Sequence, residues 1–180
     1  SSQEVVRVRI ASKQDIGAVA CLFDAYRQFY NQPADLARAT QFIDQRIRAN
    51  ESIILLAEDG SITAAGFCQM YPTFCSVEAI PIYVLYDLFV ASEHRRCGIG
   101  QLLMQAAESH ARQSGVGRID LATAKSNLAA QALYESLGWR RGARVEPGID
   151  IHHRHVAEGR QDAGDDGGDE QHADALLGVD

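Results

Sequence analysis

The chain has 180 residues, a net charge of −7 and 46% hydrophobic side chains, which predicts one globular domain with its own buried core. Residues 1–146 hold as many basic as acidic side chains, so the net charge comes from residues 147–180. A neutral body with no basic stripe argues against a nucleic-acid partner. The cysteines form no CxxC pair, and no apolar run suits a membrane span or a leader. We therefore expect a cytoplasmic protein without a membrane partner.

Hydrophobic periodicity predicts the order β-α-α-β-β-β-α-β-α. The expected strands span about residues 6–10, 52–58, 62–71, 82–90 and 118–124, and the expected helices about residues 16–30, 33–49, 99–114 and 127–137. Asp59-Gly60 predicts a tight hairpin turn that needs positive φ angles, whereas Pro72 and Pro81 predict a loop. This order favours an α/β fold with a mixed sheet and helices on both faces.

A Gly-x-Gly turn from Arg95 to Gly100 lies between an apolar strand and a helix. Glycines let backbone N–H groups approach a ligand closely, and a helix start adds unpaired donors and a positive dipole, so the turn suits a phosphate group. No Gly-Lys-Ser/Thr follows, which excludes a Walker loop, and the third glycine of a dinucleotide fingerprint is absent. An ordinary strand-to-helix turn remains the alternative interpretation.

Two segments together resemble the GCN5-related N-acetyltransferase (GNAT) family. Arg95, Gly98 and Gly100 match Arg/Gln-x-x-Gly-x-Gly/Ala after the strand at 86–90, and residues 127–139 are similar to Asn-x-x-Ala…Tyr-x-x-x-Gly-Phe/Trp. With the preceding strand order, the resemblance covers about residues 5–141. It implies the GNAT fold, a mostly antiparallel central sheet with a splayed parallel pair and helices on both faces.

The resemblance implies acetyl-CoA as cosubstrate and no metal. The turn's N–H groups would hold the pyrophosphate, the Arg95 side chain could add a contact, and the backbone of the splayed strand would pair with pantetheine amides. Asn127 would contact the pantetheine, cap its helix, or both. The expected cofactor-binding residues are Leu88, Phe89, Val90, Arg95, Arg96, Cys97, Gly98, Ile99, Gly100, Gln101, Asn127 and Tyr134.

Two residues are the expected catalytic groups. Tyr134 matches the family position that protonates the departing thiolate. An amine of pKa about 10.4 needs a deprotonation route, and Asp87, on an apolar strand, is the leading base; it could equally be a structural residue. Glu78 and Tyr86 are weaker candidates. Double displacement through Cys97 is disfavoured, because that thiol lies in the phosphate turn.

The acceptor is less determined. The aromatic pattern of the first helix resembles the family's small-amine branch, which includes histone/polyamine and diamine acetyltransferases. Tyr26, Tyr30 and Tyr86 are expected to line the acceptor pocket, with Phe74 and Tyr83 as further wall candidates, although such aromatics are often core. Diamine enzymes commonly carry an acid at the position of Tyr86, which argues against a polyamine.

Direct acetyl transfer to a primary amine of a small molecule (a polyamine, an amino acid or similar) or of a protein is the predicted function. The alternative is a non-catalytic CoA-binding regulatory or interaction protein. A homodimer is compatible with the sequence.

We expect an N-acetyltransferase domain over residues 1–146 and an acidic tail over 147–180, disordered or aberrant. The abrupt change near residue 141 favours a frameshifted or artificial C-terminus, and the missing initiator Met favours a processed or trimmed chain. A hairpin of 144–146 with 149–156 around Pro147-Gly148 is the other interpretation. Its histidines (His152, His153, His155, His172) are expected to be solvated rather than metal ligands.

Overall fold

The computed structural model describes residues 5–146 and 149–156. Within them the strands are β1 (Arg7–Ile10), β2 (Ile53–Glu58), β3 (Ala64–Cys75), β4 (Ile80–Val90), β5 (Arg118–Ala124), β6 (Arg140–Glu146) and β7 (Ile149–His155). The α-helices are α1 (Ile16–Phe29), α2 (Leu36–Arg48), α3 (Ile99–Gln113) and α4 (Leu128–Ser136), and short 3-10 turns cover Lys13–Asp15 and Ser92–His94. Within this part of the chain, no helix is both long and apolar enough to cross a membrane.

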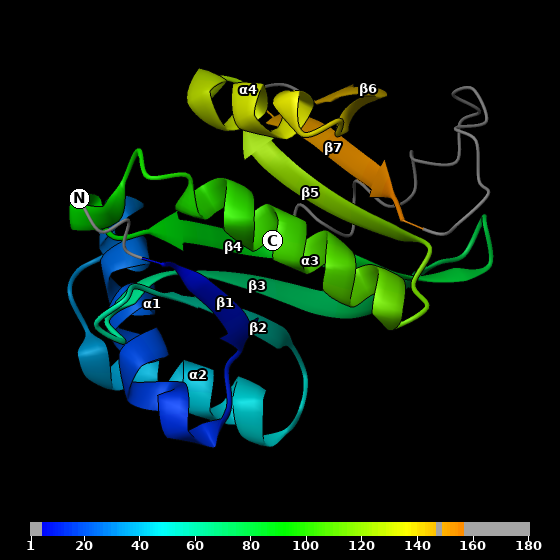
Figure 1. The fold of residues 1–180 in the computed structure, drawn as a ribbon. Coiled ribbons are helices and arrows are strands. Elements are labelled where there is room, and N and C mark those ends of the chain that lie inside the picture. The colour runs from blue at the N-terminus through cyan, green and yellow to red at the C-terminus, as the bar shows by residue number, and fades with distance from the viewer. Residues whose placement is uncertain (1–4, 147–148, 157–180) are drawn as a thin grey trace. The chain divides into compact units, whose positions relative to one another are not determined.

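The strands form one mixed sheet in the order β1-β2-β3-β4-β5-β7-β6 (Figure 1). β1, β2 and β3 pair antiparallel, as do β5, β7 and β6. The parallel register joins β4 to β5, from Ile82 opposite Arg118 to Leu85 opposite Leu121. The predicted mixed sheet with one parallel pair is therefore confirmed.

The chain divides into two compact units, and the first comprises residues 1–71 and 87–107. Its core lies between α1, α2 and the strands beside them, with Val19, Ile43 and Phe67 fully buried. The apolar side chains of α1 recur at three- and four-residue steps, which turns one face of the helix onto this core. Ring contacts link the core aromatics, with Phe23 lying 5.2 Å from Phe42 between ring centroids.

The second unit comprises residues 72–86 and 108–180, of which the described part contains β5, β6, β7 and α4. Trp139 is buried and donates its indole N–H to Glu108 at 2.9 Å. Arg118 is 1% exposed, and its guanidinium donates to both Asp120 and Glu78. A buried cation with two carboxylate partners satisfies its donors, so this cluster has a structural explanation.

The hairpin between β2 and β3 differs from the predicted two-residue turn. Positive φ falls on Ile62 (62°), not on Gly60. The carboxylate of Asp59 accepts hydrogen bonds from the backbone N–H groups of Ser61 and Thr63, at 2.9 and 3.0 Å. These bonds close a wider loop, because an Asp side chain can organise a turn that the backbone alone would not form.

The loop expected around Pro72 and Pro81 is also wrong. β3 continues through Pro72, and β4 includes Pro81. Pro81 still provides a carbonyl, which accepts from the N–H of Gly117 at 3.0 Å. A proline is compatible with a strand where its missing N–H is not needed for the ladder.

The C-terminal hairpin interpretation is confirmed for the described residues, because β7 pairs with both β6 and β5. His152 is fully buried on β7, so its expected solvation is wrong. The alternation along a strand explains this, since His152 lies opposite Leu121 and shares its inward face. His172 and residues 157–180 lie outside the described residues, and the domain division at 146 stays a prediction.

Gly66 on β3 allows a close backbone approach inside the first unit. A Cβ atom at this position would lie 2.7 Å from the carbonyl oxygen of Phe89 and 3.3 Å from the Cα of Val90. The Ile99 side chain would lie at 3.4 Å. Any larger residue would therefore push β3 away from the end of β4 and the start of α3.

We expect Gly66→Ala to lower the free energy of unfolding by about 1–3 kcal/mol, because backbone atoms must shift to admit the methyl group. Gly17→Ala is the matched control, since nothing lies within 4 Å of its added Cβ. That helical substitution should stabilise by up to about 1 kcal/mol. Urea unfolding of both variants checks the prediction, and equal effects would contradict it.

Candidate functional site

The Gly-x-Gly turn follows β4 and the short 3-10 turn and leads directly into α3. Arg96 has φ of 65° and Gly98 has φ of 76°, so two positions of the turn are left-handed. The carbonyl of Gly98 accepts from the N–H of Leu102 at 3.1 Å, which begins the helix. The first-turn N–H groups of a helix have no partner inside it, and they supply the donors of an anion site.

The Arg95 side chain lies against the end of α1. Its Nε donates to the carbonyl oxygen of Val90 at 3.1 Å. Its guanidinium carbon lies 5.6 Å from the ring centroid of Phe29 and 5.7 Å from that of Phe89. Cation–π contacts of this kind hold the turn's first residue to α1, and the expected contact with pyrophosphate stays a prediction.

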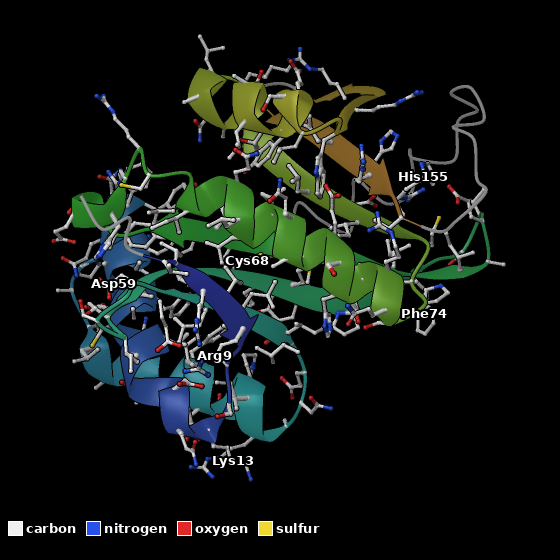
Figure 2. All side chains as sticks on the ribbon, in the orientation of Figure 1. Arg9, Lys13, Asp59, Cys68, Phe74 and His155 are labelled. Carbon is white, nitrogen blue, oxygen red and sulfur yellow. The ribbon has the colours of Figure 1, made fainter. Side chains whose placement is uncertain are left out.

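His94 attaches the same segment to the β2–β3 hairpin. Its Nε2 lies 3.0 Å from the carboxylate of Asp59, the residue that closes the hairpin loop (Figure 2). The pKa of Asp59 is held below its usual value, chiefly by the Thr63 N–H and then by His94. The hairpin thus supports the approach to the turn.

Asp87 lies on β4 in a mostly buried environment. It accepts a hydrogen bond from Gln69 Nε2 at 2.7 Å and another from the Tyr26 hydroxyl. Burial raises the pKa of Asp87, and the two hydrogen bonds oppose that shift only in part. Burial and the nearby Asp87 charge also raise the pKa of the Cys68 thiol on β3 (Figure 2).

A hydrogen-bonded pair lies beyond Asp87. Gln69 is fully buried, and its Oε1 accepts from the Ser52 hydroxyl at 2.9 Å. Neither residue was predicted from the sequence, because neither belongs to a motif. One signal was present: Gln69 is the single strongly polar side chain in the apolar run Ala64–Met70.

Aromatic side chains cluster at the end of α1, and one of them, Tyr26, contacts Asp87 in the first unit. The rings of Tyr26 and Tyr30 lie 5.1 Å apart, and Tyr26 lies 6.0 Å from Phe89. Phe29 and Tyr30 are 60% and 55% exposed, so they form a surface that a ligand can reach. The predicted pocket residues Tyr26 and Tyr30 are therefore neighbours.

The other predicted acceptor residues belong to the second unit. Tyr86 is 47% exposed and Phe74 is 71% exposed. Tyr83 is buried and stacks on the His110 ring at 6.0 Å. Glu78 accepts from Arg118, which favours a structural role for that carboxylate over a role as base.

Asn127 and Tyr134 belong to the second unit, on α4. The Asn127 Oδ1 accepts from the N–H of Ala130 at 3.1 Å, so its helix-capping role is confirmed. Tyr134 is 7% exposed, and its ring centroid lies 6.2 Å from Trp139 and 5.8 Å from His152. Packing on both sides fixes the orientation of the Tyr134 ring.

The mixed sheet, the glycine turn before α3 and the Asn-capped helix with its tyrosine are the features on which the sequence resembles the GNAT family. The model of the Acetyltransferase (GNAT) family matches residues 19–139, and the chain belongs to this family of N-acetyltransferases. Members of this family use acetyl-CoA as the acetyl donor, which supports the cofactor prediction.

The relatives agree with this assignment. The uncharacterized N-acetyltransferase YhfO of Bacillus subtilis is 42% identical over 134 residues, which cover 74% of this chain and 89% of YhfO. A crystal structure of a probable acetyltransferase superposes with a TM-score of 0.73 at 34% identity, covering 78% of this chain and 93% of that one. The L-ornithine N5-acetyltransferase NATA1 of Arabidopsis thaliana is 32% identical over 77 residues, 43% of this chain and 34% of NATA1.

We expect Asp87→Asn to raise the free energy of unfolding at pH 7. The raised pKa means that the folded protein binds the Asp87 proton more tightly than the unfolded chain does. The free energy of unfolding therefore falls as pH rises from the Asp pKa in the unfolded chain, about 3.9, through the higher pKa in the folded protein. The gain from Asn should shrink as pH approaches 4, and urea unfolding at both pH values measures it.

Asp15→Asn is the control with the opposite sign. The Arg9 hydrogen bond lowers the pKa of Asp15 to about 2 in the folded protein. The ionised Asp15 therefore stabilises the fold fully above the pKa that it has in the unfolded chain, and this contribution is lost as pH falls toward 2. This variant should lose stability at pH 7. A loss of stability in Asp87→Asn as well would favour the structural interpretation of Asp87.

Proposed function

We propose that this N-acetyltransferase transfers acetyl directly from acetyl-CoA to a primary amine, with small-molecule amines as the favoured acceptors. The observation that carries the proposal is the mostly buried Asp87 carboxylate beside the aromatics of α1. Within the described residues, its hydrogen-bond partners are the neutral donors Gln69 and Tyr26. A carboxylate without a cationic partner suits the ammonium form of an acceptor.

The turn from Arg96 to Gln101 would hold the cofactor by its backbone. Its left-handed residues and the start of α3 support this role, because N–H groups and the helix dipole both favour a pyrophosphate. The backbone of Leu88–Val90 would pair with pantetheine amides in the manner of an added strand. Asn127 uses its oxygen as a helix cap, which leaves its NH₂ group as the part that would reach pantetheine.

In the proposed reaction, Asp87 takes a proton from the bound ammonium, directly or through water. The free amine nitrogen attacks the thioester carbonyl carbon, and a C–N bond forms. As the C–S bond breaks, the nitrogen releases its second proton to solvent, which leaves the neutral amide. Tyr134 gives its phenolic proton to the departing thiolate and recovers one from solvent. The raised pKa of Asp87 brings it nearer to that of the amine, which helps the first step.

The small-amine preference rests on two observations. Tyr26 donates to Asp87 and packs on the exposed ring of Tyr30, and aromatic faces attract ammonium groups. The local similarity to the L-ornithine enzyme NATA1 supports an amine on a short apolar stem. Tyr86, where diamine enzymes commonly carry an acid, supports an amino acid or monoamine over a polyamine.

We expect the protein to release free CoA thiol only when acetyl-CoA and a suitable amine are both present. A panel of acceptor amines tests this, comprising L-ornithine, L-lysine, spermidine, phenethylamine and a lysine peptide. Thiol release is followed with a chromogenic reagent. Because Cys21 and Cys97 are exposed, a blank without amine corrects for their reaction. Cys97→Ala should keep its turnover if transfer is direct. Acetyl-CoA binding with no thiol release for any amine would contradict the proposal.

Tyr134→Phe tests the acid in the same assay. Loss of the phenolic proton should lower kcat about a hundredfold, because a positioned general acid contributes roughly that factor. The dissociation constant of acetyl-CoA should stay unchanged, since the ring and its packing are retained. Unchanged kcat would show that another group protonates the thiolate.

We expect Gly98→Ala to weaken acetyl-CoA binding at least about tenfold, while Gly115→Ala leaves binding unchanged. The two glycines have φ of 76° and 75°, and nothing lies within 4 Å of either added Cβ. Both variants should therefore lose the same stability, about 1–2 kcal/mol. Calorimetric titration with acetyl-CoA separates them, and equal affinities would place the cofactor elsewhere.

A further inference from the structure

A hydrogen-bond chain crosses three neighbouring strands of the first unit and ends at Asp87. Ser52, just before β2, donates to Gln69 Oε1 on β3 at 2.9 Å. Gln69 Nε2 then donates to Asp87 Oδ2 on β4 at 2.7 Å. Gln69 is fully buried, so both ends of its amide need these partners.

The direction of this chain depends on the charge of Asp87. A glutamine amide has one accepting end and one donating end. With the Ser52 hydroxyl donating to Oε1, the NH₂ end faces Asp87, and the carboxylate accepts from it in its ionised form. The reverse orientation would present Oε1 to Asp87 and would need a protonated carboxyl group as donor. The orientation with the NH₂ end toward Asp87 therefore suits the charged state, in which both carboxylate oxygens accept hydrogen bonds.

We propose that Gln69, oriented by Ser52, is a positioning residue that keeps Asp87 ionised and aimed for the acceptor amine, with Tyr26 as the second donor. The inference rests on the proposed role of Asp87 in acetyl transfer. Gln69 acts through Asp87 and does not itself touch the acceptor. Burial limits the access of water to the Asp87 carboxylate and so removes hydrogen bonds that water would donate. The Gln69 amide replaces part of that stabilisation.

The groups around Asp87 make this contribution decisive. Cys68 on β3 is fully buried with a raised thiol pKa, so it stays neutral and adds no charge beside Asp87. Tyr26 on α1 is a neutral phenol that donates one hydrogen bond. In the described chain, the hydrogen bonds from Gln69 and Tyr26 are what oppose desolvation, and loss of either favours the protonated, inactive form.

The test is Gln69→Met, which keeps side-chain length but removes both amide groups. With the best amine of the panel, kcat/KM is measured from pH 5 to pH 9. We expect the ratio of kcat/KM at pH 6 to that at pH 8 to fall, by up to about tenfold, relative to the unsubstituted protein, because a hydrogen bond to a charged group is lost. The acceptor amine titrates identically in every assay, so its effect cancels when the ratio for the variant is compared with that for the unsubstituted protein.

Ser52→Ala should shift the profile in the same direction by less, because the amide remains but is no longer held in orientation. Tyr26→Phe should resemble Gln69→Met, since it removes the other donor. Met70→Leu is the matched control for repacking β3, because Met70 is a fully buried neighbour of Gln69. All variants should bind acetyl-CoA as the unsubstituted protein does.

A uniform loss of kcat/KM at every pH in Gln69→Met, or an unchanged profile, would overturn the inference. If Gln69→Met fails to fold, the profiles of Ser52→Ala and Tyr26→Phe decide, and unshifted profiles overturn it. Failure of the proposed function is distinguishable, because the unsubstituted protein would then release no thiol with any amine.

Discussion

A mostly buried carboxylate between β-strands is the constraint that organises the first unit. Asp87 is only partly exposed to water, and burial raises its pKa. A residue in that position persists only where neighbouring elements supply donors, and here α1 provides Tyr26 and β3 provides Gln69. The packing of α1 on the sheet thus sets the charge of Asp87 as well as closing the core. In the proposed reaction, stability and acetyl transfer would place opposite demands on this residue, which is common for functional groups.

The expected cofactor turn relies on backbone geometry. Left-handed conformation at Gly98 is inexpensive, whereas at Arg96 a side chain adopts the same region at some cost in strain. Contacts outside the turn hold this shape, since Arg95 reaches Val90 and His94 reaches Asp59. Gly66 lets β3 approach the strand end beneath them. A site built from backbone groups tolerates many side chains, which is why the motif specifies few residues.

The sequence predicted those elements whose signal is local. Periodicity and the Asn127 cap indicated strands and helices, and the glycine turn indicated an anion site. The predictions were wrong where residues distant in the sequence determine the local structure. Asp59 closes a wider loop and shifts positive φ to Ile62, and β4 includes Pro81, whose carbonyl accepts from the distant Gly117. The burial of His152 depends on pairing with β5, and the role of Gln69 depends on Ser52 and Asp87.

In the proposed function, Tyr26 would connect acceptor recognition to the charge of Asp87. Its ring packs on Tyr30 and Phe89, while its hydroxyl donates to the carboxylate. An ammonium group that settles against these rings would also bring positive charge toward Asp87, which strengthens ionisation at the moment a base is required. An acceptor without that charge would gain aromatic contact and leave the carboxylate prone to protonation. Selection among amines would then operate through the protonation state of Asp87, in addition to the shape of the pocket.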